Sequence, residues 1–186
     1  MNKNVAIIAG EPYSVFLELL FKSLRSNKIK KPFLLICSKT LLISQMKKLN
    51  YNFKINQINN NKFDRIKLLK NHINILDVKF KFKKTFDKIS NNSSTYIENC
   101  FKEGLSLAQN KNFNVLINGP ISKKHFLRKK FNGITEYVAK KIRKNGQEVM
   151  LIYNNKLSVS PVTTHLPLSE VKRNLTSKKI IKNVET

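Results

Sequence analysis

Three short segments of the sequence could carry chemistry, because each places polar residues directly after an apolar run. They are residues 10–14 (GEPYS), 118–123 (NGPISK) and 162–168 (VTTHLPL). In an open α/β sheet, ligands bind at the carboxyl ends of the strands. The three segments therefore predict one sheet edge that carries a ligand site.

The third segment contains His165, one of only three histidines in the chain. A neutral imidazole binds divalent metals, and Thr163 or Thr164 could orient the ring through its other nitrogen. A lone histidine can equally be a structural residue, and a catalytic metal needs about three protein ligands. His165 is therefore a candidate for one metal ligand among several.

The other two segments could contact an anion. Gly119 allows a ligand to approach the backbone, Pro120 rigidifies the turn, and Lys123 could neutralise a phosphate or carboxylate. Lys123 could also be an ordinary exposed residue of a lysine-rich chain. Residues 10–14 could present backbone amides to a ligand, but they lack a glycine-rich phosphate fingerprint, so a plain strand-to-helix turn is the alternative.

Other reaction types find no support in the sequence. It contains no Ser-His-Asp order, Cys-x-x-Cys pair, paired-carboxylate motif or Walker sequence. Cys100 lies on an apolar helical face, which favours a small core residue over a nucleophile. His72 and His125 stand in polar, basic surroundings and are predicted at the surface. Residue chemistry alone thus indicates an α/β ligand-binding domain.

The elements that must position these segments alternate between strand and helix. The chain opens with two buried-strand patterns, each followed by a helical periodicity, which predicts a mostly parallel sheet with helical crossovers. Expected strands are 5–9, 33–37, 53–55, 75–78 and 113–118, with a hairpin of 148–153 and 157–162. Expected helices carry 15–24, 41–49, 97–108 and 135–144, with a short one from Ser122 and another from 177. Ser14, Ser38 or Thr40, Ser93 or Ser94, and Thr176 are the predicted caps.

Composition narrows the class of protein further. The chain has 186 residues, 41% hydrophobic, with 36 Lys+Arg against 11 Asp+Glu and a net charge of +25. The lysines are spread along the chain, without an arginine-rich arm or zinc-finger spacing, so we predict no specific nucleic-acid partner. The apolar runs are too short for a bilayer-spanning helix, which predicts no membrane association. Two cysteines and no secretory signal favour a cytoplasmic protein.

Four segments together resemble one enzyme family. Residues 10–12 resemble its Gly-[Asp/Glu]-Pro turn, and 118–123 its Thr-Gly-Pro-x-x-Lys segment. Residues 133–136 (GITE) are similar to its Gly-His-Thr-Glu motif, and 163–168 (TTHLPL) to its Thr-Thr-His-[Leu/Ile]-Pro-Leu segment. In order and spacing these segments resemble 4-hydroxythreonine-4-phosphate dehydrogenase, an enzyme of pyridoxal phosphate biosynthesis, over essentially the whole chain.

The resemblance implies an isocitrate/isopropylmalate dehydrogenase-like fold, in a homodimer with the site between two domains. It implies NAD- or NADP-dependent oxidation, with decarboxylation, of 4-phosphooxy-L-threonine, a phosphorylated hydroxy-amino acid of vitamin B6 biosynthesis. A divalent metal (Zn, Mg or Co) held by three histidines would polarise the substrate alcohol. By motif match, His165 would bind the metal and Thr135 the substrate phosphate, with Lys123 in a matching substrate-binding segment.

Three departures qualify the resemblance. Ile134 replaces the family's histidine beside Thr135, and residues 13–16 replace its glycine-rich continuation. Chains of the family run to roughly 330 residues. We therefore expect residues 1–186 to be the N-terminal portion of such a dehydrogenase, without a predicted internal boundary and inert alone. The alternatives are a related dehydrogenase for another phosphorylated hydroxy acid, or a non-enzymatic basic binding module on a degenerate scaffold.

Overall fold

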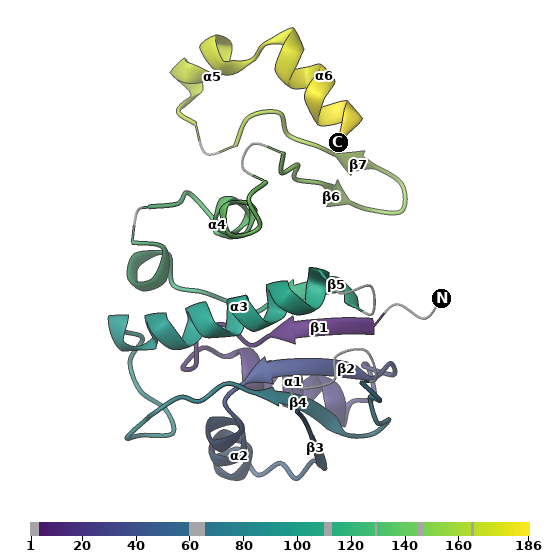
Figure 1. Ribbon diagram of the computed structural model, residues 1–186, viewed down its shortest axis with the longest axis vertical. Coiled ribbons are helices and arrows are strands. Elements are labelled where there is room, and N and C mark those ends of the chain that lie inside the picture. The colour runs from purple at the N-terminus through teal and green to yellow at the C-terminus, as the bar shows by residue number, and fades with distance from the viewer. Residues whose placement is uncertain (1–3, 60–65, 110–112, 129, 145–146, 165) are drawn as a thin grey trace. The chain divides into compact units, whose positions relative to one another are not determined.

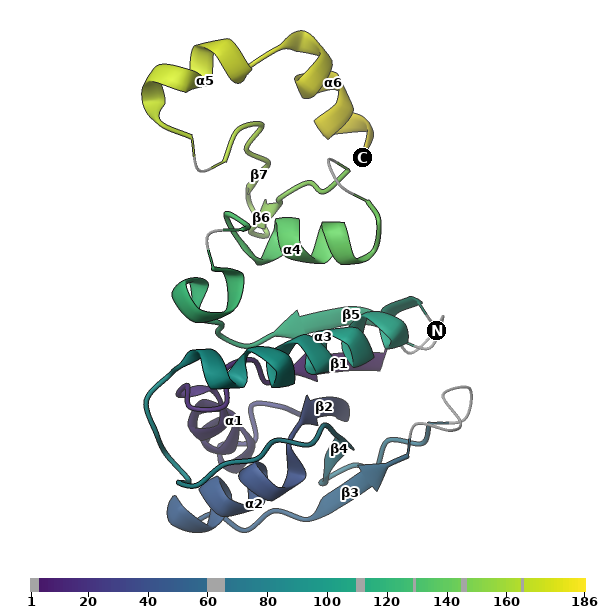
Figure 2. The ribbon, with the colours of Figure 1, turned by 60° about the vertical axis from the view of Figure 1, so that its left-hand side comes forward.

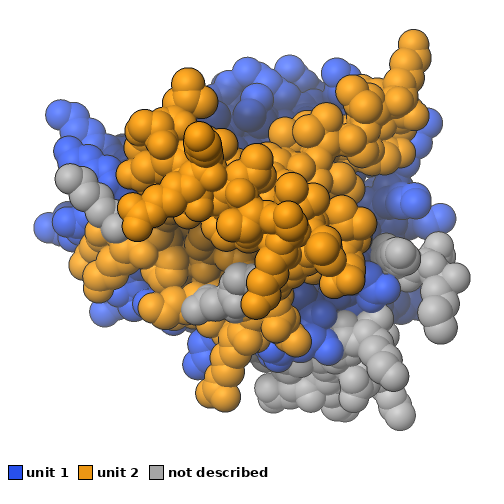
Figure 3. Space-filling view, turned by 90° about the horizontal axis from the view of Figure 1, so that it is seen from above, with its two compact units in different colours: residues 1–126 blue, residues 127–186 orange. Residues whose placement is uncertain are grey.

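The computed structural model describes residues 4–59, 66–109, 113–128, 130–144, 147–164 and 166–186. The chain divides into two compact units, Met1–Phe126 (unit 1) and Leu127–Thr186 (unit 2). Figure 3 colours the two units separately. Each unit has its own helices and strands, and each contains some of the predicted site residues.

Unit 1 is built on a parallel sheet of five strands in the order β3-β4-β2-β1-β5. The strands are β1 (Asn4–Ile8), β2 (Phe33–Cys37), β3 (Ile55–Ile58), β4 (Ile73–Asp77) and β5 (Phe113–Asn118). Helices cover both faces, which is why the central strand β2 is buried and apolar at every residue. The sequence prediction of a mostly parallel sheet with helical crossovers is confirmed.

The helices of unit 1 are α1 (Phe16–Arg25), α2 (Lys39–Lys48) and α3 (Ser94–Gln109). Helices α1 and α2 pack on one face of the sheet and α3 on the other (Figure 1, Figure 2). Side chains alternate between the faces along each strand. In β1, Ile7 therefore joins the core of α1 and α2, while Ile8 reaches Gly104 of α3.

Two capping predictions have different outcomes. Ser38 caps α2 as predicted, because its Oγ accepts from the backbone nitrogen of Leu41 at 3.4 Å. Ser14 is not the N-cap of α1: that position is Val15, and Ser14 Oγ accepts only from Phe16 N at 3.4 Å. Helix α3 follows a short 3-10 turn, Asn91–Ser93, which Ser90 caps.

The predicted strands 53–55 and 75–78 were displaced, since the observed strands are Ile55–Ile58 and Ile73–Asp77. Asn74 explains the second difference. It is fully buried within β4, where its side chain donates to the Phe33 carbonyl at 3.2 Å and accepts from Asn56 at 2.8 Å. An amide with buried partners can occupy a central strand that hydrophobicity alone would exclude.

Cys100 lies in the core of unit 1, as predicted. Its side chain is fully buried on α3, and burial raises the pKa of the thiol to about 12. A thiol held in its neutral form is a poor nucleophile, so Cys100 is a packing residue.

Unit 2 holds α4 (Ile134–Lys141), β6 (Ile152–Tyr153), β7 (Ser158–Val159), α5 (Leu168–Asn174) and α6 (Ser177–Glu185). The predicted hairpin exists, with Ile152 opposite Val159, but its strands are only two residues long; among the described residues no further strand pairs with them. Thr176 caps α6 as predicted. Helix α4 ends at Lys141, three residues before the predicted end at 144. The predicted turn at 145–146 lies outside the described residues. Helix α5 was not predicted. Within the described residues, no helix has the length and apolar character needed to cross a membrane.

Candidate functional site

The loops after β1 and β5 meet at the carboxyl edge of the unit 1 sheet. Gly119 N donates to the Ile8 carbonyl at 2.7 Å, and Glu11 N donates to the Pro120 carbonyl at 2.8 Å. Parallel neighbouring strands end at the same edge, so the segments 10–14 and 118–123 are brought together as the sequence predicted. The third predicted segment, 162–168, follows β7 in unit 2 and not a strand of this sheet.

Glycine is required on both sides of this contact. Gly10 has a φ of +79°, in the left-handed region that side chains disfavour. A Cβ added at Gly119 would lie 2.2 Å from the Ala9 carbonyl oxygen. Because the opposing atom belongs to the backbone, it cannot rotate away, and the two loops can approach only without side chains.

Glu11 is the buried acid of this edge, with 2% of its surface exposed. Burial raises the pKa of its carboxyl group, against opposing effects of the Ser93 hydrogen bond and of His125. The Ser93 hydroxyl lies 2.6 Å from Glu11 Oε1 and 3.0 Å from the Ser90 carbonyl oxygen. One hydroxyl proton cannot serve both acceptors at full strength. The Ser93 hydroxyl donates to both oxygens, and its hydrogen bond to Glu11 Oε1 is the shorter of the two.

His125 and Lys123 belong to a single π-helical turn, Lys123–Leu127, close to the short helix predicted from Ser122. His125 was predicted at the surface and is partly exposed: its Nδ1 lies 3.0 Å from Asn91 Oδ1, and its carbonyl accepts from Ser94 Oγ at 3.0 Å. Lys123 is exposed. That exposure suits a ligand contact and a solvated lysine equally.

A small pocket of unit 2 contains the other predicted segments. It has a volume of about 150 Å³ and is lined by Thr135, Glu136, Glu148, Thr164 and five further residues. Thr135 is the second residue of α4, whose N-cap is Gly133 and carries no side-chain cap. No cap side chain therefore competes with an anion for the first amides of α4. His165 lies outside the described residues, but its neighbour Thr164 lines the same pocket as Thr135.

Two carboxyl groups of this pocket were not anticipated as site residues. Glu136 Oε2 and Glu148 Oε2 are buried and make no hydrogen bond to the described residues. Glu136 belongs to the segment 133–136, so the motif could have drawn attention to it, whereas nothing in the sequence distinguishes Glu148. Buried carboxyl oxygens without a hydrogen-bond partner favour a cationic or hydrogen-donating group close to them.

The residues that the structure describes do not form a metal site by themselves. They contain no group of three or more His, Cys, Asp or Glu side chains that could hold an ion. A catalytic metal needs about three protein ligands, and His165 supplies one at most. Further ligands from outside the described residues are required.

Solved structures with the same fold are known. A 4-hydroxythreonine-4-phosphate dehydrogenase from Burkholderia phymatum superposes with a TM-score of 0.82 at 21% identity, covering 98% of this chain and 56% of that one. The fold is therefore the isocitrate dehydrogenase-like α/β fold of these dehydrogenases, as the sequence predicted.

The chain belongs to the family of the pyridoxal phosphate biosynthetic protein PdxA, whose sequence pattern matches residues 28–186. The 4-hydroxythreonine-4-phosphate dehydrogenase of Sulfurihydrogenibium sp. (strain YO3AOP1) is 30% identical over 97% of this chain and 55% of its own length. That of Wigglesworthia glossinidia brevipalpis is 28% identical over 97% and 56%. The chain thus spans about half the length of the curated relatives it matches.

Proposed function

We propose that this chain forms part of a 4-hydroxythreonine-4-phosphate dehydrogenase, which oxidises and decarboxylates 4-phosphooxy-L-threonine in pyridoxal phosphate biosynthesis. Membership of the PdxA family supports the reaction class. The observation that carries the site is the shared pocket of Thr135 and Thr164, which unites the segments 133–136 and 163–168 within unit 2.

Each site residue has a role set by its chemistry. The Thr135 hydroxyl and the open amides at the start of α4 bind the substrate phosphate. Lys123, in unit 1, keeps the role that its motif implies, a cationic contact for an anionic substrate. The buried carboxyl groups of Glu136 and Glu148 favour a positively charged partner, and the ammonium group of the substrate carries such a charge.

The proposed reaction also needs NAD or NADP to accept hydride and a divalent metal, Zn, Mg or Co, to polarise the alcohol. His165 would be one ligand of that metal. Because the described residues contain no complete ligand set, the remaining ligands must come from other chain segments. A homodimer is the proposed assembly and the cytoplasm the proposed compartment, where the buried free thiols Cys37 and Cys100 stay reduced.

The first test is whether residues 1–186 are sufficient for turnover. We expect no NADH or NADPH formation from 4-phosphooxy-L-threonine with these residues alone, and turnover from the complete reading frame if it encodes two further histidines in metal-site contexts. Loss of that turnover on addition of a chelator would support the requirement for a divalent metal. A complete protein that binds the substrate but transfers no hydride would contradict the dehydrogenase assignment.

A second candidate is a related dehydrogenase acting on another phosphorylated hydroxy acid. Ile134 favours it, because this apolar side chain removes a hydrogen-bond donor beside Thr135. Comparing kcat/KM for 4-phosphooxy-L-threonine and for phosphorylated hydroxy acids without an amino group separates the two. A preference for acids without the amino group would support the second candidate.

A further inference from the structure

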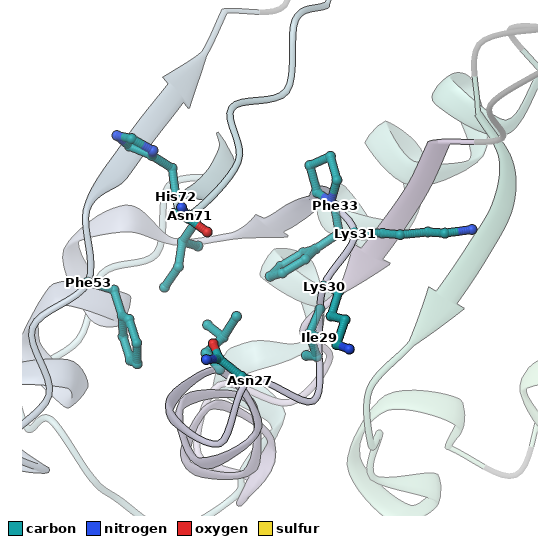
Figure 4. A pocket seen from close by; sticks show the side chains of 11 residues that line it. Asn27, Ile29, Lys30, Lys31, Phe33, Phe53, Asn71 and His72 are labelled. Carbon is teal, nitrogen blue, oxygen red and sulfur yellow. The ribbon is translucent and has the colours of Figure 1, made fainter.

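A larger cavity lies in unit 1, at the edge of the sheet opposite to the loops of Gly10 and Gly119. It has a volume of about 500 Å³ and is lined in part by Phe33 and Ile73, the first residues of β2 and β4 (Figure 4). Cavities of about 300–1,000 Å³ accommodate small organic ligands. Nothing in the proposed dehydrogenase reaction uses this edge.

Two aromatic rings shape the cavity. Phe33 is buried and Phe53 half-buried, and Figure 4 shows their rings on opposite sides of the opening. Phe53 is fixed in place because its ring stacks on Tyr51 at 5.8 Å and on Phe21 at 5.9 Å between centroids. Rigid aromatic walls favour a flat ring as ligand.

Two amide side chains contribute the polar groups of the rim. Asn27 and Asn71 line the cavity, both with backbone in the left-handed region, at φ of 53° and 59°. Both are exposed, and neither side chain makes a hydrogen bond to the described residues. An amide can donate and accept, which matches the nitrogen and oxygen atoms on the edge of a heteroaromatic ring.

The charge of the rim is positive. Lys30 and Lys31 are among the lining residues, which include no acidic side chain. Figure 4 shows the Lys31 side chain extending away from the cavity, and the charges of Lys30 and Lys31 make the potential around the rim positive, which attracts an anion. His72 has a ring nitrogen occupied, since its Nδ1 donates to the Lys70 carbonyl at 2.9 Å, and we assign it no role.

We propose that this cavity binds a small molecule in which a flat heteroaromatic ring carries a phosphate group. The ring lies between Phe33 and Phe53, its polar edge meets Asn27 and Asn71, and the phosphate lies at the lysine side of the rim. Adenine nucleotides and pyridine phosphates share this chemistry. The inference is independent of the dehydrogenase reaction, because it concerns the other edge of the sheet.

Calorimetric titration of the 186-residue chain tests the proposal with four probes: AMP, pyridoxine 5′-phosphate, adenosine and inorganic phosphate. We expect saturable one-to-one binding of AMP or of pyridoxine 5′-phosphate, and the stronger of the two identifies the source. Adenosine should bind about tenfold more weakly than AMP if the nucleotide is the ligand, because it lacks the charge. Failure of both phosphate-bearing rings to bind would overturn the proposal.

Matched variants locate the binding. Lys30→Gln/Lys31→Gln should weaken the phosphate-bearing ligand about tenfold, whereas Lys83→Gln/Lys84→Gln removes the same charge from exposed lysines that do not line the cavity and should change affinity less than twofold. Asn27→Asp/Asn71→Asp preserves size and backbone preference and should also weaken binding at least tenfold. Equal weakening by the two lysine pairs would show non-specific attraction and overturn the assignment.

Discussion

The Ser93 hydroxyl lies 2.6 Å from the Glu11 carboxyl oxygen, although 82 residues separate the two in sequence. Glu11 follows β1 and Ser93 precedes α3, so the contact ties a strand-end loop to the start of the helix that covers the sheet. It also holds a carboxyl group where water is excluded. The protonation of Glu11 is therefore coupled to folding.

Replacing Glu11 with Gln should remove one source of the pH dependence of the free energy of unfolding. Burial raises the pKa of Glu11 above its ordinary 4.5, so at higher pH the folded state retains a proton that the unfolded chain has lost. Stability then falls as pH rises through the window above 4.5. Urea unfolding of wild type and Glu11→Gln should show the variant gaining in relative stability from pH 4.5 to pH 8. Parallel pH profiles would contradict a raised pKa of the buried Glu11 carboxyl group.

Gly119→Ala should destabilise unit 1 by more than about 2 kcal/mol, because the new Cβ meets a backbone carbonyl that cannot rotate away. Gly104→Ala is the matched control. There the Cβ would meet the end of the Ile8 side chain, and alanine improves helix propensity by about 1 kcal/mol. Its net cost should stay within about 1 kcal/mol. Equal costs, measured by chemical denaturation, would contradict the backbone contact between the two loops.

Tyr96→Phe should cost about 1–3 kcal/mol of stability, the usual effect of leaving a buried donor unpaired. The backbone nitrogen of Ser38 donates to the Tyr96 hydroxyl at 3.0 Å, and both residues are buried. Tyr13→Phe removes a hydroxyl that makes no hydrogen bond to the described residues and should change stability by less than about 0.5 kcal/mol. Thermal unfolding of the two variants in parallel provides the comparison.

Ile134→His should strengthen binding of 4-phosphooxy-L-threonine by about tenfold, because a hydrogen bond to a charged group contributes about 1.5–3 kcal/mol. Residue 134 begins α4, directly before Thr135. Val138→His adds the same ring one turn further along α4 and should have no such effect. If calorimetry detects no gain for Ile134→His, the phosphate does not bind beside Thr135.

Local patterns predicted much of the secondary structure, because hydrophobic periodicity and capping act within a few residues. Strand β2 and the Ser38 and Thr176 caps are examples. Where local patterns gave the wrong bounds for a strand, residues distant in sequence determined the structure. Asn74 is stable in a central strand because distant residues such as Asn56 and Phe33 provide hydrogen-bond partners. The hairpin strands are short, and no third strand pairs with them among the residues that the structure describes.

The sequence alone determined which segments carry chemistry and which family they resemble, since both depend on the identity and order of residues. The tertiary structure decided which segments share a pocket and which acids lie buried. Glu148 lines the same pocket as Thr135, and Ser93 donates a hydrogen bond to Glu11, through chain folding that no short spacing encodes. The pKa of a carboxyl group likewise depends on the water and charges around it, and only packing fixes those.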